Sequence, residues 1–192
     1  DGNHGRAVAW TANKLKQKSV IYMPSNTAKS RIDNILAENG KVVLVDGTFD
    51  DCVIKVAEDS AKNGWQVISD TAYPGYIEIP GYIMLGYTTI FKEADEQMSK
   101  QNLHSPDFVF LQSGVGGLSA AGTSHNVLKY KELRPKLISV EPTDCDCFLE
   151  SVRNSKGEAI PTKGKQESIM AGLNCGTPSP LAWKILKEGM DS

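Results

Sequence analysis

The chain has 192 residues, a formal net charge of −2 and a sequence pI near 6.0. That length allows one large domain or two small ones with a sizeable core, whereas the charge provides neither a basic face for nucleic acid nor a polybasic membrane signal. The longest apolar runs are about strand length, well short of the roughly 20 residues that a membrane span needs, and the first residues do not resemble a signal peptide. The 4 cysteines are too few for a disulfide scaffold. We therefore expect a soluble, cytoplasmic protein with a small-molecule ligand and reduced thiols.

Helices and strands alternate through the first half of the chain. The spacing of apolar residues predicts a helix over 4–17, with Asn3 near its N-cap and its side chain exposed. A strand over 20–23 follows, and Ser25 or Asn26 is expected to cap the next helix, which ends at Gly40. The same reasoning predicts a strand over 42–45, a helix over 50–63 and a strand over 66–69.

This alternation recurs about every two dozen residues, which is typical of stacked βαβ units around a parallel sheet. Asp46 and Asp70 each follow the carboxyl end of a predicted strand, the edge at which open α/β sheets build their sites. The irregular stretch after Asp70 contains Pro74 and Pro80, and such residues interrupt regular structure. We predict a small α/β domain over 1–80 and part of a larger α/β domain over 81–192.

The second half continues the pattern. A helix is predicted over 82–98, a buried strand over 108–112, a helix over 118–130 and a strand over 137–140. Residues 143–166 are mixed and polar. Ser179 and Pro180 then predict the start of a last helix, with Ser179 as the cap and Pro180 at the first helical position.

A glycine-rich stretch, Ser113-Gly-Val-Gly-Gly117, joins the strand over 108–112 to the helix that follows. Glycine has no Cβ, so the backbone can turn sharply there and point several N–H groups the same way. At a helix N-terminus such N–H groups favour a phosphate. A tight strand-to-helix turn without a ligand explains the same glycines. A Rossmann dinucleotide site is less well supported, because the third spaced glycine and its acidic partner are missing.

Three stretches resemble a known enzyme family. DGNHGRAVAW (residues 1–10), DTAYPGYIEIP (residues 70–80) and IMAGLNCGTP (residues 169–178), together with the glycine-rich stretch, are similar to fold-type-II pyridoxal-phosphate enzymes, the tryptophan synthase β-like group. Within that group they are most similar to diaminopropionate ammonia-lyases. The resemblance runs over nearly the whole chain and implies two parallel-sheet, three-layer α/β domains, incomplete at both ends.

The resemblance implies roles for named residues. The family holds the cofactor ring hydroxyl with the asparagine of this motif, which is Asn3 here, and the phosphate with the backbone of the glycine-rich loop. Those positions are Gly114, Val115, Gly116, Gly117 and Leu118, with Ser113 alongside. The implied cofactor is pyridoxal 5'-phosphate, which provides the electron sink for carbanion chemistry.

The implied reaction is α,β-elimination of ammonia from 2,3-diaminopropionate, giving pyruvate and ammonia. Asp1 stands where the dehydratases of this group have serine, and it is the candidate base for the α-proton of one substrate enantiomer. Asp70 is the candidate group that holds the β-ammonium or helps it to leave, because a carboxylate suits a second cation. Alternatives are a capping role for Asp1 and a turn role for Asp70.

The family attaches the cofactor to a lysine upstream of the Gly-Asn-His motif, and the segment that faces the pyridine nitrogen is expected after residue 192. We therefore interpret the chain as an internal fragment and assign the activity to the parent enzyme. A serine/threonine dehydratase and a non-catalytic ligand-binding fragment are the alternatives. The family is usually homodimeric, which we adopt by analogy.

The stretch Glu141-Pro-Thr-Asp-Cys-Asp-Cys147 is acidic, and some relatives bind a metal after the corresponding Glu-Pro. We expect a solvated loop and no metal here. Cys147 and Cys175 fall in stretches shared with the ammonia-lyases, where a cysteine pair near the opening of the site is an alternative to two reduced thiols.

Overall fold

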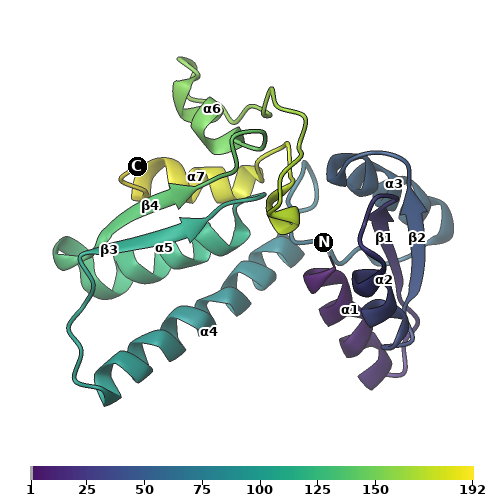
Figure 1. Cartoon of the computed structure of the whole chain (residues 1–192), viewed down its shortest axis with the longest axis horizontal. Coiled ribbons are helices and arrows are strands. Elements are labelled where there is room, and N and C mark those ends of the chain that lie inside the picture. Colours follow the sequence, from purple (N-terminus) through teal and green to yellow (C-terminus); the bar gives the residue numbers. More distant parts are fainter. Residues whose placement is uncertain (1) are drawn as a thin grey trace.

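The computed structural model describes residues 2–192 and shows two lobes, each built on a two-stranded parallel sheet (Figure 1). The first lobe comprises residues 2–69 and the second lobe residues 78–192. The predicted mixed α/β architecture with parallel strands is confirmed. Residue 80, where the boundary is predicted, lies in the first turn of helix α4, Glu78–Lys100, and the division into two domains remains a prediction.

The first lobe alternates helices and strands: α1 Asn3–Lys14, β1 Val20–Pro24, α2 Lys29–Leu36, β2 Lys41–Val45 and α3 Phe49–Asn63. β1 and β2 are paired in parallel from Val20 with Lys41 to Pro24 with Val45. Its core is the cluster of Ala9, Met23 and Ile35, each at most 2% exposed. This small core packs the two flanking helices against one side of the strand pair.

The second lobe begins with α4 and continues with β3 Phe108–Gln112, α5 Gly117–Tyr130, the 3₁₀ turn η1 Lys131–Leu133, β4 Lys136–Val140, α6 Cys147–Arg153, the 3₁₀ turn η2 Ala171–Leu173 and α7 Pro180–Gly189. β3 and β4 are paired in parallel from Phe108 with Lys136 to Gln112 with Val140. A cluster around Phe148, Trp183 and Leu186 forms the core between α6 and α7. None of the helices within residues 2–192 has the length and apolarity that crossing a membrane requires.

The strand predicted over 66–69 is wrong. No ladder forms there in the described chain, because other groups occupy the backbone of this segment. The hydroxyl of Tyr76 lies 3.2 Å from the carbonyl oxygen of Val67 and accepts a 2.8 Å hydrogen bond from the N–H of Ser69. His4 Nε2 donates to the carbonyl oxygen of Ile68 at 2.9 Å. A strand needs a neighbouring strand for these groups, and here side chains take that place.

The predicted cap of the second helix is also wrong. The N-cap of α2 is Ala28, not Ser25 or Asn26. The N–H of Ser25 instead donates to the carbonyl oxygen of Val45 at 2.8 Å, which extends the strand pairing by one residue. Thr27 then closes a turn on Pro24, so the polar residues serve the turn, as serine and asparagine often do.

Candidate functional site

The glycine-rich loop joins β3 to α5, as the sequence predicts. Gly116 is the N-cap of α5 and has a φ of 95°, in the left-handed region that favours glycine, and no side chain caps the helix. A Cβ at Gly116 would lie 2.8 Å from the Cβ of Ala182 and closer still to the ring of Phe148. Both the conformation and the packing therefore require glycine at this position.

The backbone N–H groups of Gly114, Val115, Gly116, Gly117 and Leu118 find no acceptor within residues 2–192. By contrast, the N–H of Ser113 donates to Val140 of β4 and the N–H of Ala120 donates to Gly116, each at 2.9 Å. Residues 115–117 are buried. Buried donors without an acceptor are costly, and an anion at a helix N-terminus satisfies such donors. The loop therefore fits a phosphate.

Ser113 anchors this loop through a buried hydroxyl group. Its side chain is fully buried, and its Oγ donates to Ser119 Oγ at 3.0 Å and lies 2.7 Å from Ser139 Oγ. Ser119 Oγ in turn donates to the carbonyl oxygen of Gly116 at 3.1 Å. The three hydroxyls hold the strand end, the loop and the first turn of α5 together. We therefore expect Ser113 to act beside the cofactor by positioning the loop.

Asp70 lies next to the loop. Its carbonyl oxygen is 3.8 Å from the position that a Cβ on Gly117 would occupy. Close by, the N–H of Ala72 donates to Ser179 Oγ at 3.2 Å, which fixes residues 70–72 against the start of α7. Burial, and to a lesser degree the negative charge of Asp70, raises the pKa of Tyr87. The structure thus places Asp70, one of the two predicted catalytic residues, next to the glycine-rich loop.

Asn3 starts α1, with an exposed side chain whose Oδ1 accepts a hydrogen bond from Arg31 at 3.3 Å. The next residue, His4, is bonded to Ile68, two residues before Asp70. The first turn of α1 is therefore tied to the segment that reaches the loop, and it lies on the side of the first lobe that faces the second (Figure 1). The cofactor-binding role of Asn3 remains a prediction. Asp1, the other predicted catalytic residue, lies outside the described residues.

A segment from the second lobe covers the loop. A Cβ on Gly114 would lie 3.4 Å from the carbonyl oxygen of Gly172, 3.6 Å from Leu173 Cα and 3.3 Å from Cys175 Sγ. Cys147 Sγ donates to the carbonyl oxygen of Gly114 at 3.6 Å. Only the family resemblance placed Cys175 near the opening of the site, because nothing local in residues 171–175 indicates a contact with the loop.

The cysteines around the loop are free and buried thiols. Burial, with the nearby charges of Asp70 and Asp50, raises the pKa of Cys175 to about 12. Burial, with the charge of Glu141, also raises the pKa of Cys147. A thiol nucleophile needs a lowered pKa, so these cysteines are not suited to nucleophilic chemistry at neutral pH.

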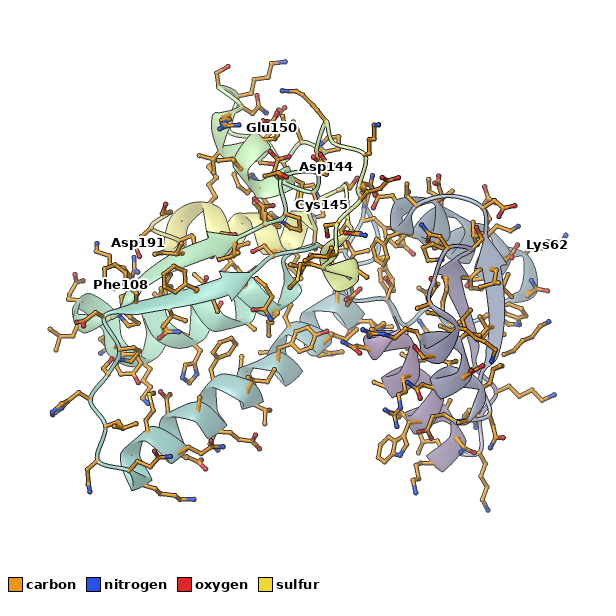
Figure 2. The ribbon with its side chains drawn as sticks, in the orientation of Figure 1. Lys62, Phe108, Asp144, Cys145, Glu150 and Asp191 are labelled. Atoms are coloured by element: carbon orange, nitrogen blue, oxygen red, sulfur yellow. The ribbon has the colours of Figure 1, made fainter. Side chains whose placement is uncertain are left out.

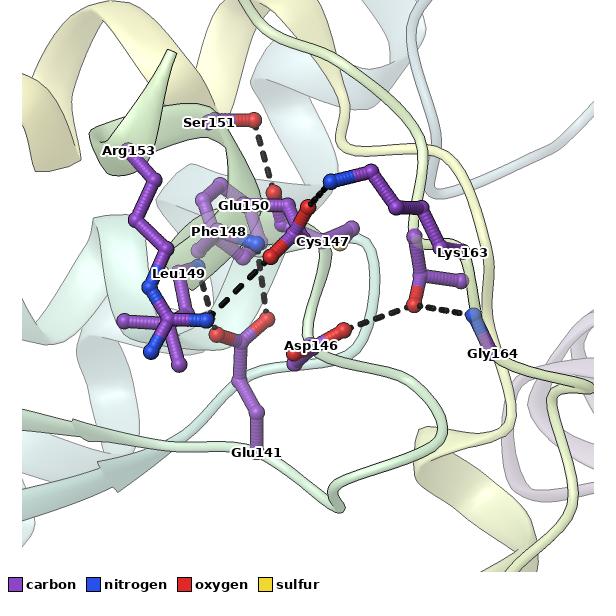
Figure 3. A network of polar contacts seen from close by, with 11 residues as sticks. Glu141, Asp146, Cys147, Phe148, Leu149, Glu150, Ser151, Arg153, Lys163 and Gly164 are labelled. Atoms are coloured by element: carbon purple, nitrogen blue, oxygen red, sulfur yellow. Dashed lines mark hydrogen bonds and ion pairs between the residues drawn. The ribbon is translucent and has the colours of Figure 1, made fainter.

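The solvated loop predicted over 141–147 is wrong, and the network that replaces it is shown in Figure 3. The carboxylate of Glu141 accepts hydrogen bonds from the N–H groups of Phe148 and Leu149 at 2.8 and 2.9 Å, in the first turn of α6. Burial raises the pKa of Glu141 although these bonds oppose the rise. Within residues 2–192 no group of three or more His, Cys, Asp and Glu side chains is arranged to hold a metal ion. Glu141 therefore has a capping role.

Comparison with known proteins identifies relatives over the whole chain. The family described as pyridoxal-phosphate dependent enzyme matches residues 1–192. The diaminopropionate ammonia-lyase of Escherichia coli K12 is 42% identical over 188 residues, which are 98% of this chain and 46% of the relative. The biosynthetic L-threonine dehydratase of Staphylococcus epidermidis is 28% identical over 193 residues, 99% of this chain and 43% of the relative.

Solved structures identify similar proteins. A crystal structure of the Escherichia coli diaminopropionate ammonia-lyase in complex with D-serine matches with a TM-score of 0.90 and 40% identity, covering 98% of this chain and 46% of that one. The predicted tryptophan synthase β-like fold is confirmed by this likeness. The chain spans less than half the length of the relatives it matches.

Proposed function

Because the chain belongs to the pyridoxal-phosphate-dependent enzyme family, we propose that the intact protein eliminates ammonia from 2,3-diaminopropionate, with pyridoxal 5'-phosphate as cofactor and pyruvate and ammonia as products. The observation that carries the cofactor assignment is the row of loop N–H groups at residues 114–118, of which residues 115–117 are buried and which find no acceptor within residues 2–192. The 42% identity to the Escherichia coli enzyme supports the choice of substrate.

In this proposal the loop binds the phosphate by its main chain. The N–H groups of residues 114–118 would donate hydrogen bonds to the dianion, and the positive end of the α5 dipole would stabilise its charge. Ser113 keeps the loop in place through Ser119 and Ser139. When bound, pyridoxal phosphate supplies an electron sink for negative charge at the substrate α-carbon.

The candidates for the proton transfers are the carboxylates of Asp1 and Asp70. Elimination breaks the Cα–H bond and the Cβ–N bond, so a base accepts the α-proton and the β-amino group departs with a proton. Asp1 is the candidate base, and Asp70 the candidate that pairs with the β-ammonium and assists its departure. The released unsaturated amine adds water and loses the second ammonia, which leaves pyruvate.

The test is turnover by the intact protein. With pyridoxal phosphate and 2,3-diaminopropionate, we expect pyruvate and ammonia in a ratio of about one to two, as the balanced reaction requires. Asp70→Asn keeps the shape but removes the charge, and it should lower kcat/KM for diaminopropionate by about 100-fold. Asp46→Asn is the matched control, because Asp46 follows the carboxyl end of β2 and is exposed, and it should change kcat/KM by less than about twofold.

Two results would contradict the proposal. Faster turnover of serine or threonine than of diaminopropionate would indicate a dehydratase, in line with the 28% identical L-threonine dehydratase. Binding of the cofactor without turnover of any of these amino acids would indicate a ligand-binding protein.

The proposal includes a homodimer located in the cytoplasm, by analogy with the family. It includes no nucleic-acid or membrane partner, in keeping with the formal net charge of −2. Light scattering of the intact protein would test the dimer, and cell fractionation would test the location. A monomer at micromolar concentration would contradict the first expectation.

A further inference from the structure

Residues 161–177 contain the stretch that covers the glycine-rich loop, and they also reach the first lobe. Within this segment, the turn η2 lies over Gly114, where a Cβ would be 3.4 Å from the Gly172 carbonyl oxygen and 3.6 Å from Leu173 Cα. A Cβ on Gly114 would thus be in van der Waals contact with the turn, so the two backbones lie close together. A shift of this segment would therefore change the space above the loop N–H groups.

Several hydrogen bonds attach this segment to its own lobe. The N–H of Thr162 donates to the carbonyl oxygen of Gly176 at 2.9 Å, and the N–H of Gln166 donates to that of Asp144 at 3.1 Å. In the view of Figure 2, Asp144 and Cys145 lie between α6 and the first lobe. These bonds close the segment on itself and on the residues before α6, but they do not restrain it relative to the first lobe.

That restraint comes from Asp50. Thr177 Oγ1 donates a 2.8 Å hydrogen bond to Asp50 Oδ2, across 127 residues of sequence. Asp50 lies in the first turn of α3, and its neighbour Asp51 is engaged in the capping box with Thr48. A Cβ on Gly176 would lie 2.8 Å from the same Asp50 oxygen, so glycine at this position allows the carboxylate to approach.

We propose that Asp50 is a positioning residue, which holds residues 171–177 against the glycine-rich loop through its hydrogen bond to Thr177. In this arrangement a displacement of α3 changes the cover of the phosphate site, so the first lobe and the cofactor loop are mechanically coupled. The inference rests on the proposed function for the role of the loop as a phosphate site. The restraint itself depends only on the contact between the two lobes.

The experiment removes the hydrogen bond from each side in the intact protein. Asp50→Ala removes the acceptor and Thr177→Val the donor, whereas Asp50→Asn keeps an acceptor oxygen and should restore the wild-type behaviour. Glu58→Gln is the matched control, because it removes one exposed negative charge from the same helix. Two measurements are made: hydrogen exchange of the amides of 171–177, and the dissociation constant for pyridoxal phosphate.

We expect both Asp50→Ala and Thr177→Val to speed exchange of these amides by about 3- to 10-fold and to weaken pyridoxal phosphate binding by a similar factor, the size expected for one hydrogen bond. The kcat at saturating cofactor should stay within about twofold, because the reacting groups are untouched. The double variant should be no worse than either single one, since both remove the same bond.

Wild-type exchange and wild-type cofactor affinity in both single variants would overturn the inference, as would equal effects of Asp50→Asn and Asp50→Ala. Faster exchange in a protein that does not turn over diaminopropionate would leave the restraint standing while the proposed function fails. Turnover of diaminopropionate with unchanged exchange would leave the proposed function standing while the restraint fails.

Discussion

The two lobes contain the same local element, a turn from the carboxyl end of a parallel strand into a helix, and they complete it differently. In the first lobe the turn leads from β2 into α3. There Asp51 Oδ2 accepts a 2.7 Å hydrogen bond from the N–H of Thr48, and Thr48 Oγ1 accepts one from the N–H of Asp51 at 3.3 Å. In the second lobe the turn leads from β3 into α5 with Gly116 as N-cap and no side-chain cap.

This difference is the reason why we propose an anion site at the second turn and not at the first. A helix N-terminus leaves its first N–H groups unpaired, and a side chain, water or a ligand must satisfy them. At α3 the reciprocal capping box satisfies two of these groups from within the chain. At α5 small residues bring buried backbone donors together, and no side chain of the described residues caps them, which is why we propose a phosphate site there.

Of the changes at these two turns, Gly116→Ala should have the largest effect on stability. The left-handed backbone would cost about 1–2 kcal/mol with a Cβ, and the overlap with Ala182 and the ring of Phe148 would add about 1–3 kcal/mol. We expect the free energy of unfolding of the intact protein, measured by urea denaturation, to fall by about 2–5 kcal/mol in total.

Gly64→Ala is the matched control for Gly116→Ala. Gly64 also has a positive φ, 67°, but a Cβ there would meet nothing within 4 Å, so only the backbone cost of about 1–2 kcal/mol applies. In addition, inorganic phosphate should stabilise the wild type and Gly64→Ala but not Gly116→Ala. Equal stabilisation of all three proteins by phosphate would contradict an anion site at the loop.

Thr48→Ala tests the capped turn between β2 and α3 and should have a smaller effect on stability. It removes the side chain that accepts from Asp51 in the cap of α3, and loss of such a cap costs about 1 kcal/mol. Urea denaturation of the intact protein would measure this change. Because Asp50 lies in the same first turn and holds the cover of the loop in the further inference, the variant should weaken pyridoxal phosphate binding by no more than Asp50→Ala does. A loss of affinity larger than that of Asp50→Ala would contradict this order.

Among these tests, acidification should have the smallest effect on the capped turn between β2 and α3. The hydrogen bond from the backbone N–H of Thr48 lowers the pKa of Asp51 below its ordinary value. A carboxylate with a lowered folded-state pKa contributes stability above its unfolded-state pKa of about 4, and that contribution is lost as the pH falls through the folded-state value.

Asp51→Asn should therefore be less stable than the wild type at pH 7, and the difference should shrink as the pH falls below about 4. Hydrogen exchange of the first amides of α3 between pH 7 and pH 3 would measure it (intrinsic rates being corrected for pH). A difference that stays constant with pH would mean that the Asp51 carboxylate does not stabilise the cap in its ionised form.

Local patterns determined most of the helices and strands. The alternation of apolar segments predicted both parallel strand pairs, and Pro180 after Ser179 predicted the start of α7. The glycine-rich loop could also be predicted from the sequence, because strand, loop and helix follow one another within a few residues. The φ of 95° at position 116 is one that favours glycine. Within such a short stretch, backbone sterics and side-chain spacing suffice.

The tertiary structure decided what depends on partners far along the chain. Residues 66–69 match a strand in composition, yet their backbone groups pair with Tyr76 and His4. Ser179 has the residue type of a helix cap, but its hydroxyl accepts from Ala72, 107 residues away.

The cover over Gly114 and the bond between Asp50 and Thr177 have no local signature at all. The sequence by itself therefore determined where a phosphate can bind. The packing of the two lobes, which selects the partner of each polar group, decided what surrounds that site.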